Sequence, residues 1–240
     1  MKNKRTEGYP LNHYYSKIYK RYDLVNRLFT FGQDMKWRSL TAEQCLIFNP
    51  KSILDLCCGT GDLAILLNRK SGDKIQIFGL DFNRNMLDVA KKKAEKWSAG
   101  SIKFVQGNVA QMPFGDKSFD CITIGFGFRN LIFDNAESSR HISEIYRVLK
   151  PDSHLLILES AIPENSIVRV FYKIYLRLFL IPLGAVISGN YNAYSYLARS
   201  SANFYSISEM NTLMDENRFT VQSVRSFFLG AVNLIVAKKE

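Results

Sequence analysis

The sequence contains few of the residues from which metal sites and disulfide frameworks are built. It has four cysteines and three histidines in 240 residues, and two of the cysteines, Cys57 and Cys58, are adjacent. No spacing among them resembles a zinc site, and adjacent cysteines would make an awkward disulfide. We therefore expect no metal centre and four reduced, mostly buried thiols, as in a cytoplasmic protein.

The sequence also lacks a long hydrophobic run. Residues 1–9 are polar and basic with no apolar segment behind them, unlike a secretory signal peptide. The most apolar stretch, residues 178–187, contains Pro182 and Gly184 and is too short to span a bilayer, which needs about 20 residues. The sequence therefore predicts no transmembrane helix, and it shows no internal repeat or low-complexity linker.

Apolar and basic side chains are plentiful by contrast. The apolar fraction is 47%, which predicts a sizeable core in a single domain spanning residues 1–240. The net formal charge of +10 attracts nucleic acid, anionic lipid or acidic ligands without distinguishing between them. Nucleic-acid binding would require stacking residues beside the basic ones, and the lysine-rich stretch 91–96 has only Trp97 next to it. We therefore expect no nucleic-acid partner.

Strand-like and helix-like segments alternate through the middle of the chain. The predicted strands are residues 52–57, 75–80, 102–106, 119–125 and 154–159, and the predicted helices are 62–68, 84–97 and 136–149, the last ended by Pro151. This alternation is typical of an α/β fold with a doubly wound, mostly parallel sheet. A further helix at 208–217 and strands at 221–228 and 231–237 predict seven strands in all, ending in an antiparallel C-terminal hairpin.

Two segments fall outside this alternation. Residues 1–49 are predicted to form an N-terminal helical cap, with helices between residues 14 and 48 that turn around Gly32. Residues 163–206 form an aromatic-rich helical insertion on the predicted substrate side.

A glycine-containing turn follows the first strand and opens a helix. The turn reads Asp55-Leu-Cys-Cys-Gly59-Thr60-Gly61-Asp62. Its glycines let the backbone approach a ligand closely, and the helix N-terminus offers unpaired N–H groups. Asp81 ends the second strand about 20 residues later, where a carboxylate accepts hydrogen bonds from both ribose hydroxyls of a nucleotide-like cofactor. The competing interpretation, Asp81 as a helix cap, is weaker because Asn83 is the better-placed cap.

The charge of this turn distinguishes between two cofactor classes. In a dinucleotide site the pyrophosphate would lie beside Asp62, where added negative charge is unfavourable. S-adenosylmethionine (SAM) has no phosphate and carries an ammonium and a sulfonium, which suit Asp55 and Asp62. After the third strand, Asn108 and the backbone of Val109 can read an adenine edge. Met86 can cover the adenine face, or it can simply pack in the core.

Several motifs identify a family. The chain resembles, over nearly its full length, the C-methyltransferases of menaquinone and ubiquinone biosynthesis. The resemblance is carried by Arg21-Tyr-Asp-Leu-Val-Asn-Arg27, Thr30-Phe-Gly32 with Lys36-Trp-Arg38, the 54–62 turn, Phe126-Gly-Phe-Arg-Asn130, Tyr146-Arg-Val-Leu-Lys-Pro151 and Ser195-Tyr-Leu-Ala198. It implies the class I SAM methyltransferase fold and SAM contacts at Thr60, Asp81, Asn108 and Val109. The implied reaction is methyl transfer to a ring carbon of a polyprenylated hydroquinone, most simply demethylmenaquinol.

Three departures from the family pattern keep other functions open. Gly125 stands where relatives often have Ser, residues 14–19 differ from the family's Phe-Asp-x-Ile-Ala pattern, and Lys150-Pro-Asp-Ser153 replaces a Pro-Gly-Gly turn. The alternatives are a SAM-dependent methyltransferase for another apolar or aromatic acceptor, and a non-catalytic SAM-binding protein.

The candidate catalytic residues follow the fourth strand, at the carboxyl edge where parallel sheets build their sites. Arg129 can stabilise a developing phenolate, and a water held by Arg129 and Asn130 can receive a proton. The alternative for Arg129 is a structural salt bridge. His141 lies within a helical pattern and is expected on the helix surface.

The insertion is suited to an apolar acceptor. It has no acidic residue between Glu164 and Glu209, and basic residues recur every four positions at Arg169, Lys173 and Arg177. Such a helix can lie on an anionic membrane at the inner face of the cell, or it can serve as a lid or as the interface of a homodimer. The residues expected to line a ring pocket, or simply to pack, are Tyr191, Tyr194 and Tyr196.

Overall fold

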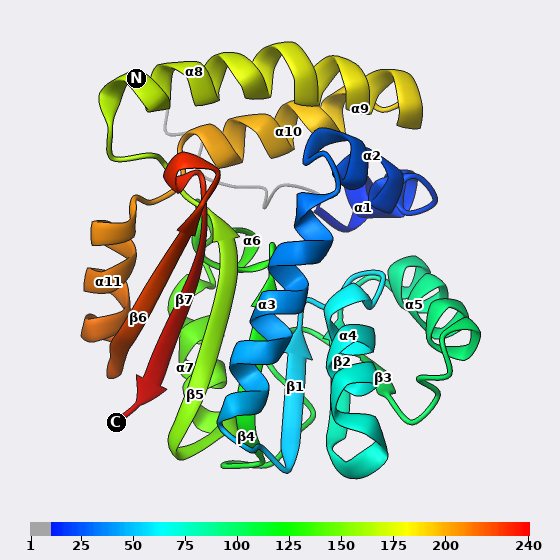
Figure 1. Cartoon of the computed structure of the whole chain (residues 1–240), viewed down its shortest axis with the longest axis vertical. Coiled ribbons are helices and arrows are strands. Elements are labelled where there is room, and N and C mark those ends of the chain that lie inside the picture. Colours follow the sequence, from blue (N-terminus) through cyan, green and yellow to red (C-terminus); the bar gives the residue numbers. More distant parts are fainter. Residues whose placement is uncertain (1–10) are drawn as a thin grey trace.

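The structure is a computed structural model that describes residues 11–240, so the signal-peptide prediction for residues 1–9 lies outside the described residues. Its centre is a seven-stranded sheet with the strand order β3-β2-β1-β4-β5-β7-β6 (Figure 1). The strands are β1 (Ser52–Leu56), β2 (Gln76–Asp81), β3 (Lys103–Gln106), β4 (Phe119–Gly125), β5 (Leu149–Ser160), β6 (Phe219–Phe227) and β7 (Val232–Lys239). Strands β1 to β5 are parallel, and β7 lies antiparallel between β5 and β6. The predicted α/β class and antiparallel C-terminal hairpin are confirmed.

Helices cover both faces of this sheet. The helices α3 (Gln33–Ile47), α4 (Asp62–Ser71) and α5 (Arg84–Lys96) supply residues to the core on one face. The other face is covered by α6 (Phe128–Ile132), α7 (Ser138–Val148) and α11 (Ile207–Glu216). Alternate residues of a strand serve the two cores: Ile53 faces the first, whereas Leu54 and Leu56 face the second. The strands are therefore apolar on both faces, as expected for a buried parallel sheet.

A third, smaller core lies at the carboxyl ends of the parallel strands. It joins α1 (Leu11–Ile18) and α2 (Tyr22–Phe29) to the insertion helices (Figure 1). The insertion contains α8 (Ser166–Tyr175), a π-helical turn (η2, Leu176–Leu180), α9 (Ile181–Ser188) and α10 (Tyr191–Ala202). The predicted turn at Gly32 is confirmed, because Gly32 has a φ of +74° immediately before α3. The cap and the insertion, predicted as separate segments, thus pack together over the sheet edge.

One helix is longer than the apolar stretch 178–187 noted in the sequence, and the absence of a transmembrane helix stays a prediction. Residues Ser166–Ser188 form one continuous helical stretch of 23 residues that is long and apolar enough to cross a bilayer, by length and composition alone. Pro182 does not interrupt it, because the π-helical turn Leu176–Leu180 ends two residues earlier and this change of helical hydrogen-bond pattern accommodates the missing N–H. Gly184 is needed for packing, since a Cβ there would collide with the ring of Tyr194 on α10.

Strand β5 begins earlier than predicted, at Leu149 rather than at residue 154. Pro151 therefore lies inside a strand. The sheet tolerates it because the register with β4 shifts between Phe119 and Cys121, and because β7 pairs with β5 only from His154 onward.

Candidate functional site

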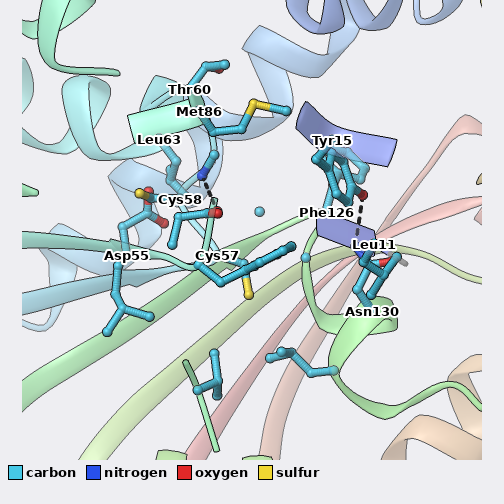
Figure 2. A pocket seen from close by; sticks show the side chains of 18 of the residues that line it. Leu11, Tyr15, Asp55, Cys57, Cys58, Thr60, Leu63, Met86, Phe126 and Asn130 are labelled. Carbon is cyan, nitrogen blue, oxygen red and sulfur yellow. Dashed lines mark hydrogen bonds between the residues drawn. The ribbon is translucent and has the colours of Figure 1, made fainter. Parts of the chain in front are cut away.

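A cavity of about 370 Å³ opens at the carboxyl ends of β1, β2 and β4. This volume lies within the usual range for small-molecule sites. Seven of the eight predicted cofactor residues line it: Asp55, Gly59, Thr60, Asp81, Met86, Asn108 and Val109. Met86 also belongs to the third core cluster, so its two interpretations are compatible. Figure 2 shows Thr60, Met86 and Tyr15 among the side chains that line this cavity.

The two glycines of the turn have different roles. Gly59 has a φ of +54° and no atom within 4 Å of where a Cβ would stand, so it leaves space for a ligand. Gly61, the eighth predicted residue, does not line the cavity. A Cβ on Gly61 would lie 2.9 Å from the Cβ of Ala90, so this glycine allows the start of α4 to pack closely against α5.

Asp81 connects the turn to the second strand. One carboxylate oxygen accepts a hydrogen bond from the backbone N–H of Gly59 (2.9 Å), and the other accepts one from Asn83 (2.9 Å). Burial raises the pKa of Asp81 to about 6. The side chain of Asn83 accepts from the backbone N–H of Met86 (3.1 Å), which confirms Asn83 as the cap of α5 and leaves Asp81 at the cavity wall.

Asp55 holds the base of the same turn. Its carboxylate accepts hydrogen bonds from the hydroxyl of Thr123 (3.0 Å) on β4 and from the backbone N–H of Ala64 (3.1 Å) in the first turn of α4. Burial raises the pKa of Asp55 to about 7. Asp55 therefore orients the glycine turn as well as lining the cavity.

The charge of Asp62 is already balanced by basic side chains of the protein. This corrects the expectation from the sequence that Asp62 is available to pair with the positive charges of SAM. Asp62 forms ion pairs with Arg27 (2.6 Å) and Lys93. Although burial opposes it, the nearby charges of Lys93, Arg38 and Arg27 hold the pKa of Asp62 below its ordinary value. Asp62 also lines the cavity, but its charge is committed to Arg27 of α2 and Lys93 of α5.

The N-terminal helices are tied to the glycine turn, a feature that the sequence did not reveal. The hydroxyl of Thr60 donates to Asp23 on α2 (2.7 Å), and Lys93 donates to the same carboxylate (2.8 Å). Arg27 also pairs with Asp34, which in turn bonds Arg38 (3.1 Å). These contacts bring the buried Arg38 to the wall of the cavity. The family motifs at 21–27 and 36–38 were the available signal, but they do not show which turn they contact.

Asn130 lines this first cavity together with Tyr15 of α1. The side-chain amide of Asn130 donates to the Tyr15 hydroxyl oxygen (3.0 Å), as Figure 2 shows. Burial raises the pKa of Tyr15 well above its ordinary value. Tyr15 is thus a neutral phenol. Its hydroxyl can donate a hydrogen bond to a ligand, and it does not act as a base.

A second, smaller cavity of about 100 Å³ adjoins the first. The two share Tyr22, Arg38 and Phe126 in their walls. The second cavity is lined mainly by apolar and aromatic side chains: Phe29 of the cap, Tyr172, Tyr175, Leu176 and Leu180 of the insertion, and Phe228 of the β6–β7 turn. Arg129 lines this cavity as well. The two predicted catalytic residues therefore line different cavities that adjoin, and the water expected between them stays a prediction.

Arg129 is buried in an ion pair. Its guanidinium donates to Glu159 (3.1 Å) and to the hydroxyl of Ser160 (2.5 Å), and its backbone N–H donates to Glu159 (3.0 Å). Within residues 11–240, its Nε is buried without a hydrogen-bond partner. Although burial opposes it, the charge of Glu159 raises the pKa of Arg129. The salt-bridge interpretation is therefore correct, and it still leaves one donor for a ligand.

Four other sequence expectations are revised. None of the three tyrosines expected at the ring pocket lines either cavity: Tyr191 is exposed, Tyr194 is buried against Gly184, and Tyr196 lines a separate hollow. The position of Tyr194 is set by the packing of α9 on α10. His141 is not on the helix surface. It is buried, its Nδ1 lies 2.8 Å from the carbonyl oxygen of Leu131, and it lines the first cavity.

Comparisons with known proteins agree on a family. The sequence model of the ubiE/COQ5 methyltransferase family matches residues 1–239. The chain is 37% identical over 221 residues to a demethylmenaquinone methyltransferase of Thermus thermophilus, covering 92% of this chain and 98% of that protein. The namesake enzyme of Thermotoga maritima is 38% identical, with 90% and 93% covered, and that of Deinococcus radiodurans is 33% identical, with 99% and 95% covered.

Solved structures agree on the fold. A SAM-dependent methyltransferase from Aquifex aeolicus superimposes with a TM-score of 0.57 at 19% identity, covering 79% of this chain and 82% of that one. The YcgJ protein of Bacillus subtilis gives a TM-score of 0.61 at 18% identity, covering 85% and 98%.

Proposed function

This chain belongs to the ubiE/COQ5 methyltransferase family, and we propose that it transfers a methyl group from SAM to a ring carbon of demethylmenaquinol. It is a SAM-dependent methyltransferase by family. The choice of acceptor rests on the curated relatives, which carry the name demethylmenaquinone methyltransferase. We further propose that the whole chain acts as one catalytic domain, with the cap and the insertion closing its acceptor side.

The first cavity is suited to SAM. Asp81 offers a carboxylate to the ribose hydroxyls, and Met86 can lie against the adenine. The side-chain oxygen of Asn108 accepts from the backbone N–H of Ala110 (3.0 Å), so the adenine contact would come from the amide nitrogen of Asn108 and the N–H of Val109. At the other end, Asp55 suits an ammonium and Arg38 suits a carboxylate, the two charged groups of a methionine moiety.

The observation that carries the proposed reaction is the second cavity beside the first. Its lining is mostly apolar and aromatic, which suits a prenylated ring, and it includes Arg129, whose Nε has no hydrogen-bond partner within residues 11–240. The shared walls at Tyr22, Arg38 and Phe126 would let an acceptor ring lie next to the cofactor. Alignment of two reactants can supply roughly 7–11 kcal/mol in favourable systems.

The residues of the chain then account for the electrostatic part of the reaction. When bound, SAM supplies an electrophilic methyl group. Arg129, kept charged by Glu159, would stabilise a phenolate on the hydroquinone once the phenolic proton has passed to water, and this raises the nucleophilicity of the ring carbon. After methylation the ring carbon would lose its own proton, which returns to the ring oxygen through water and restores the aromatic ring. Tyr15, held by Asn130, would donate a hydrogen bond to a second ring oxygen or to the cofactor carboxylate. The layer of aromatic side chains would exclude water from the two reactants.

The test is methyl transfer from labelled SAM to reduced, short-tailed demethylmenaquinone. We expect labelled methyl on the quinone ring, and its loss in Asp81→Ala, because this variant removes the ribose ligand. Asp120→Ala is the matched control: Asp120 also accepts backbone N–H bonds, from Lys51 and Ser52, but does not line the cavity.

The other outcomes separate the remaining functions. Transfer only to a ubiquinone precursor, or only to another aromatic lipid, would mean that the enzyme carries out the same reaction on a different acceptor. SAM binding without transfer to any acceptor would mean a non-catalytic protein. Because SAM is made in the cytoplasm and the acceptor has an apolar tail, we propose that the enzyme works at the inner face of the cytoplasmic membrane.

A further inference from the structure

One side of the helix Ser166–Ser188 is apolar and faces outward. Its buried stripe is Tyr172, Leu176 and Leu180, which pack in the third core. The opposite side exposes Phe171 (67%), Ile174 (46%) and Leu178 (61%). Ile167 and Val170 extend this exposed apolar stripe toward the start of the helix. A contiguous apolar surface of this kind marks an interaction site rather than ordinary solvent-exposed surface.

Two turns from distant parts of the chain lie beside this helix. The ring of Tyr175 contacts Phe29 at the end of α2 (4.9 Å between ring centroids) and Phe228 in the β6–β7 turn (5.8 Å). Figure 1 shows the β6–β7 turn at the same end of the molecule as α8. Both turns therefore belong to the same surface as the helix.

The backbone of these turns holds large apolar side chains outward. Phe31 follows α2 with a φ of +53° and is 73% exposed, and Leu229 in the β6–β7 turn has a φ of +55° and is 82% exposed. Large side chains rarely adopt this left-handed conformation, where glycine or asparagine is preferred. A strained backbone that exposes apolar side chains is the opposite of what folding in water favours, so it points to a partner for these residues.

The charges on the same surface indicate what that partner is. Lys173 and Arg177 are exposed beside the apolar stripe, and no acidic residue occurs between Glu164 and Glu209. An apolar helix face bordered by basic side chains, without acidic ones, complements the headgroups and acyl boundary of an anionic bilayer. A protein partner would have to provide an extended apolar surface with acidic groups at matching positions.

We propose that this surface is a docking face for an anionic lipid bilayer, with the helix Ser166–Ser188 lying in the plane of the interface. The docking face consists of Phe171, Ile174 and Leu178 on the helix, Phe31 and Leu229 on the two turns, and the basic residues Lys173 and Arg177. The helix lies on the membrane rather than across it. Spanning would draw Tyr172, Leu176 and Leu180 out of the protein core and place both basic residues within the hydrocarbon.

This surface adjoins the acceptor side of the enzyme. Tyr175 and Phe228, which border the docking face, also line the second cavity beside Arg129. A lipid-borne acceptor could then pass from the bilayer into the cavity between the α2–α3 turn and the helix. This last step rests on the proposed function, whereas the docking itself does not.

Co-sedimentation of the full chain with vesicles tests the proposal. We expect binding to vesicles containing phosphatidylglycerol, weaker binding to phosphatidylcholine alone, and weakening with added salt. The double variant Phe171→Ser/Leu178→Ser should bind anionic vesicles roughly 50-fold more weakly, since each exposed apolar side chain contributes about tenfold or somewhat less. Lys173→Gln/Arg177→Gln should lose roughly 10- to 30-fold, and only with the anionic vesicles.

Matched controls lie elsewhere on the molecule. Ile47→Ser removes a similarly exposed apolar side chain (66%) at the opposite end of α3, and Lys91→Gln/Lys92→Gln removes two exposed charges on α5. Both should leave vesicle binding within about twofold of the parent chain. Binding that the docking-face variants do not weaken, or that the controls weaken equally, would overturn the proposal.

Two further measurements keep the outcomes distinct. Sedimentation velocity without lipid would reveal a dimer, and its dissociation by Phe171→Ser/Leu178→Ser would assign the surface to a second copy of the chain instead. Methyl transfer to a tail-less, water-soluble acceptor should be retained in the docking variants. Vesicle binding without any such transfer would contradict the proposed function and leave the docking face intact.

Discussion

The two cavities that meet at Tyr22, Arg38 and Phe126 are built in different ways. The cofactor side is lined by the ends of consecutive strands, and its key groups bond within their own βα turn or to the adjacent one, as Asp81 does to Asn83 and to Gly59. The acceptor side is assembled from segments more than a hundred residues apart, as the contact between Phe29 and Tyr175 shows. Most of the cofactor side follows from the βα turns, to which the cap adds Tyr15 and Arg38, whereas the acceptor side exists only after the cap and the insertion have packed together.

Because of this difference, we expect the cofactor side to control SAM binding and the acceptor side to control turnover. Polar groups that are already hydrogen-bonded hold the cofactor side in shape before a ligand arrives, which reduces the cost of binding. The acceptor side has one buried unpaired donor, Arg129 Nε, in an apolar environment, where a charge acts strongly on a developing anion. Substitutions on the two sides should therefore affect different measured quantities.

Among substitutions expected to change turnover without changing SAM affinity, those at Arg129 should have the largest effect. In Arg129→Gln/Glu159→Gln we expect turnover to fall by roughly 100- to 1000-fold, the effect of removing an oxyanion-stabilising donor. The affinity for SAM should change by less than about twofold. Replacing both partners avoids leaving a buried charge uncompensated. Calorimetry with SAM and single-turnover methyl transfer measure the two quantities, and a parallel loss of SAM affinity would contradict the separation.

The pH dependence of SAM affinity tests the cofactor side. The pKa of Asp81 is raised to about 6 by burial, and that of Asp55 to about 7. Both carboxyls must be ionised to accept from ribose hydroxyls or to pair with an ammonium. SAM affinity should therefore be flat above about pH 8 and should fall as the pH drops through 7 and 6, by up to about tenfold per unit and per group.

The stability of the ligand-free protein should respond in the opposite direction. Because both folded-state pKa values lie above those of the unfolded chain, the folded state binds more protons in this range. The contribution of these two groups to the free energy of unfolding therefore rises as the pH falls from about 7 to about 4. Asp81→Asn should remove the part of the affinity slope centred near pH 6. An unchanged slope would mean that Asp81 does not titrate against SAM.

The smallest expected effect concerns Tyr15, which lines the cofactor cavity. Tyr15→Phe removes the hydroxyl held by Asn130 (3.0 Å), and one neutral hydrogen bond is worth about 1 kcal/mol. We expect kcat/KM for the acceptor to fall about fivefold. Tyr14→Phe, on the neighbouring residue that lines neither cavity, should have no effect. Equal effects of the two substitutions would exclude a role for the Tyr15 hydroxyl.

The same contrast explains which features could be predicted from the sequence. The order of strands and helices, the glycine turn and Asp81 follow from hydrophobic periodicity and from residues within about 30 positions of one another. The segment after β3, with Asn108 and Val109, was located because every parallel strand delivers its carboxyl end to the same edge. These features were determined by the sequence alone.

Other features depended on the tertiary structure. Asp62 is paired by Arg27 and Lys93, which approach from α2 and α5, and no spacing in the sequence indicates that contact. Tyr194 packs on Gly184 instead of lining a ring pocket, because the distance between α9 and α10 decides its position. Pro182 reads as a helix break, but helical geometry around it accommodates the missing N–H. The local sequence pattern determines which helices and strands form and which backbone groups their turns expose. The packing of distant elements determines which side chains meet, and the pattern along the sequence holds no information about that packing.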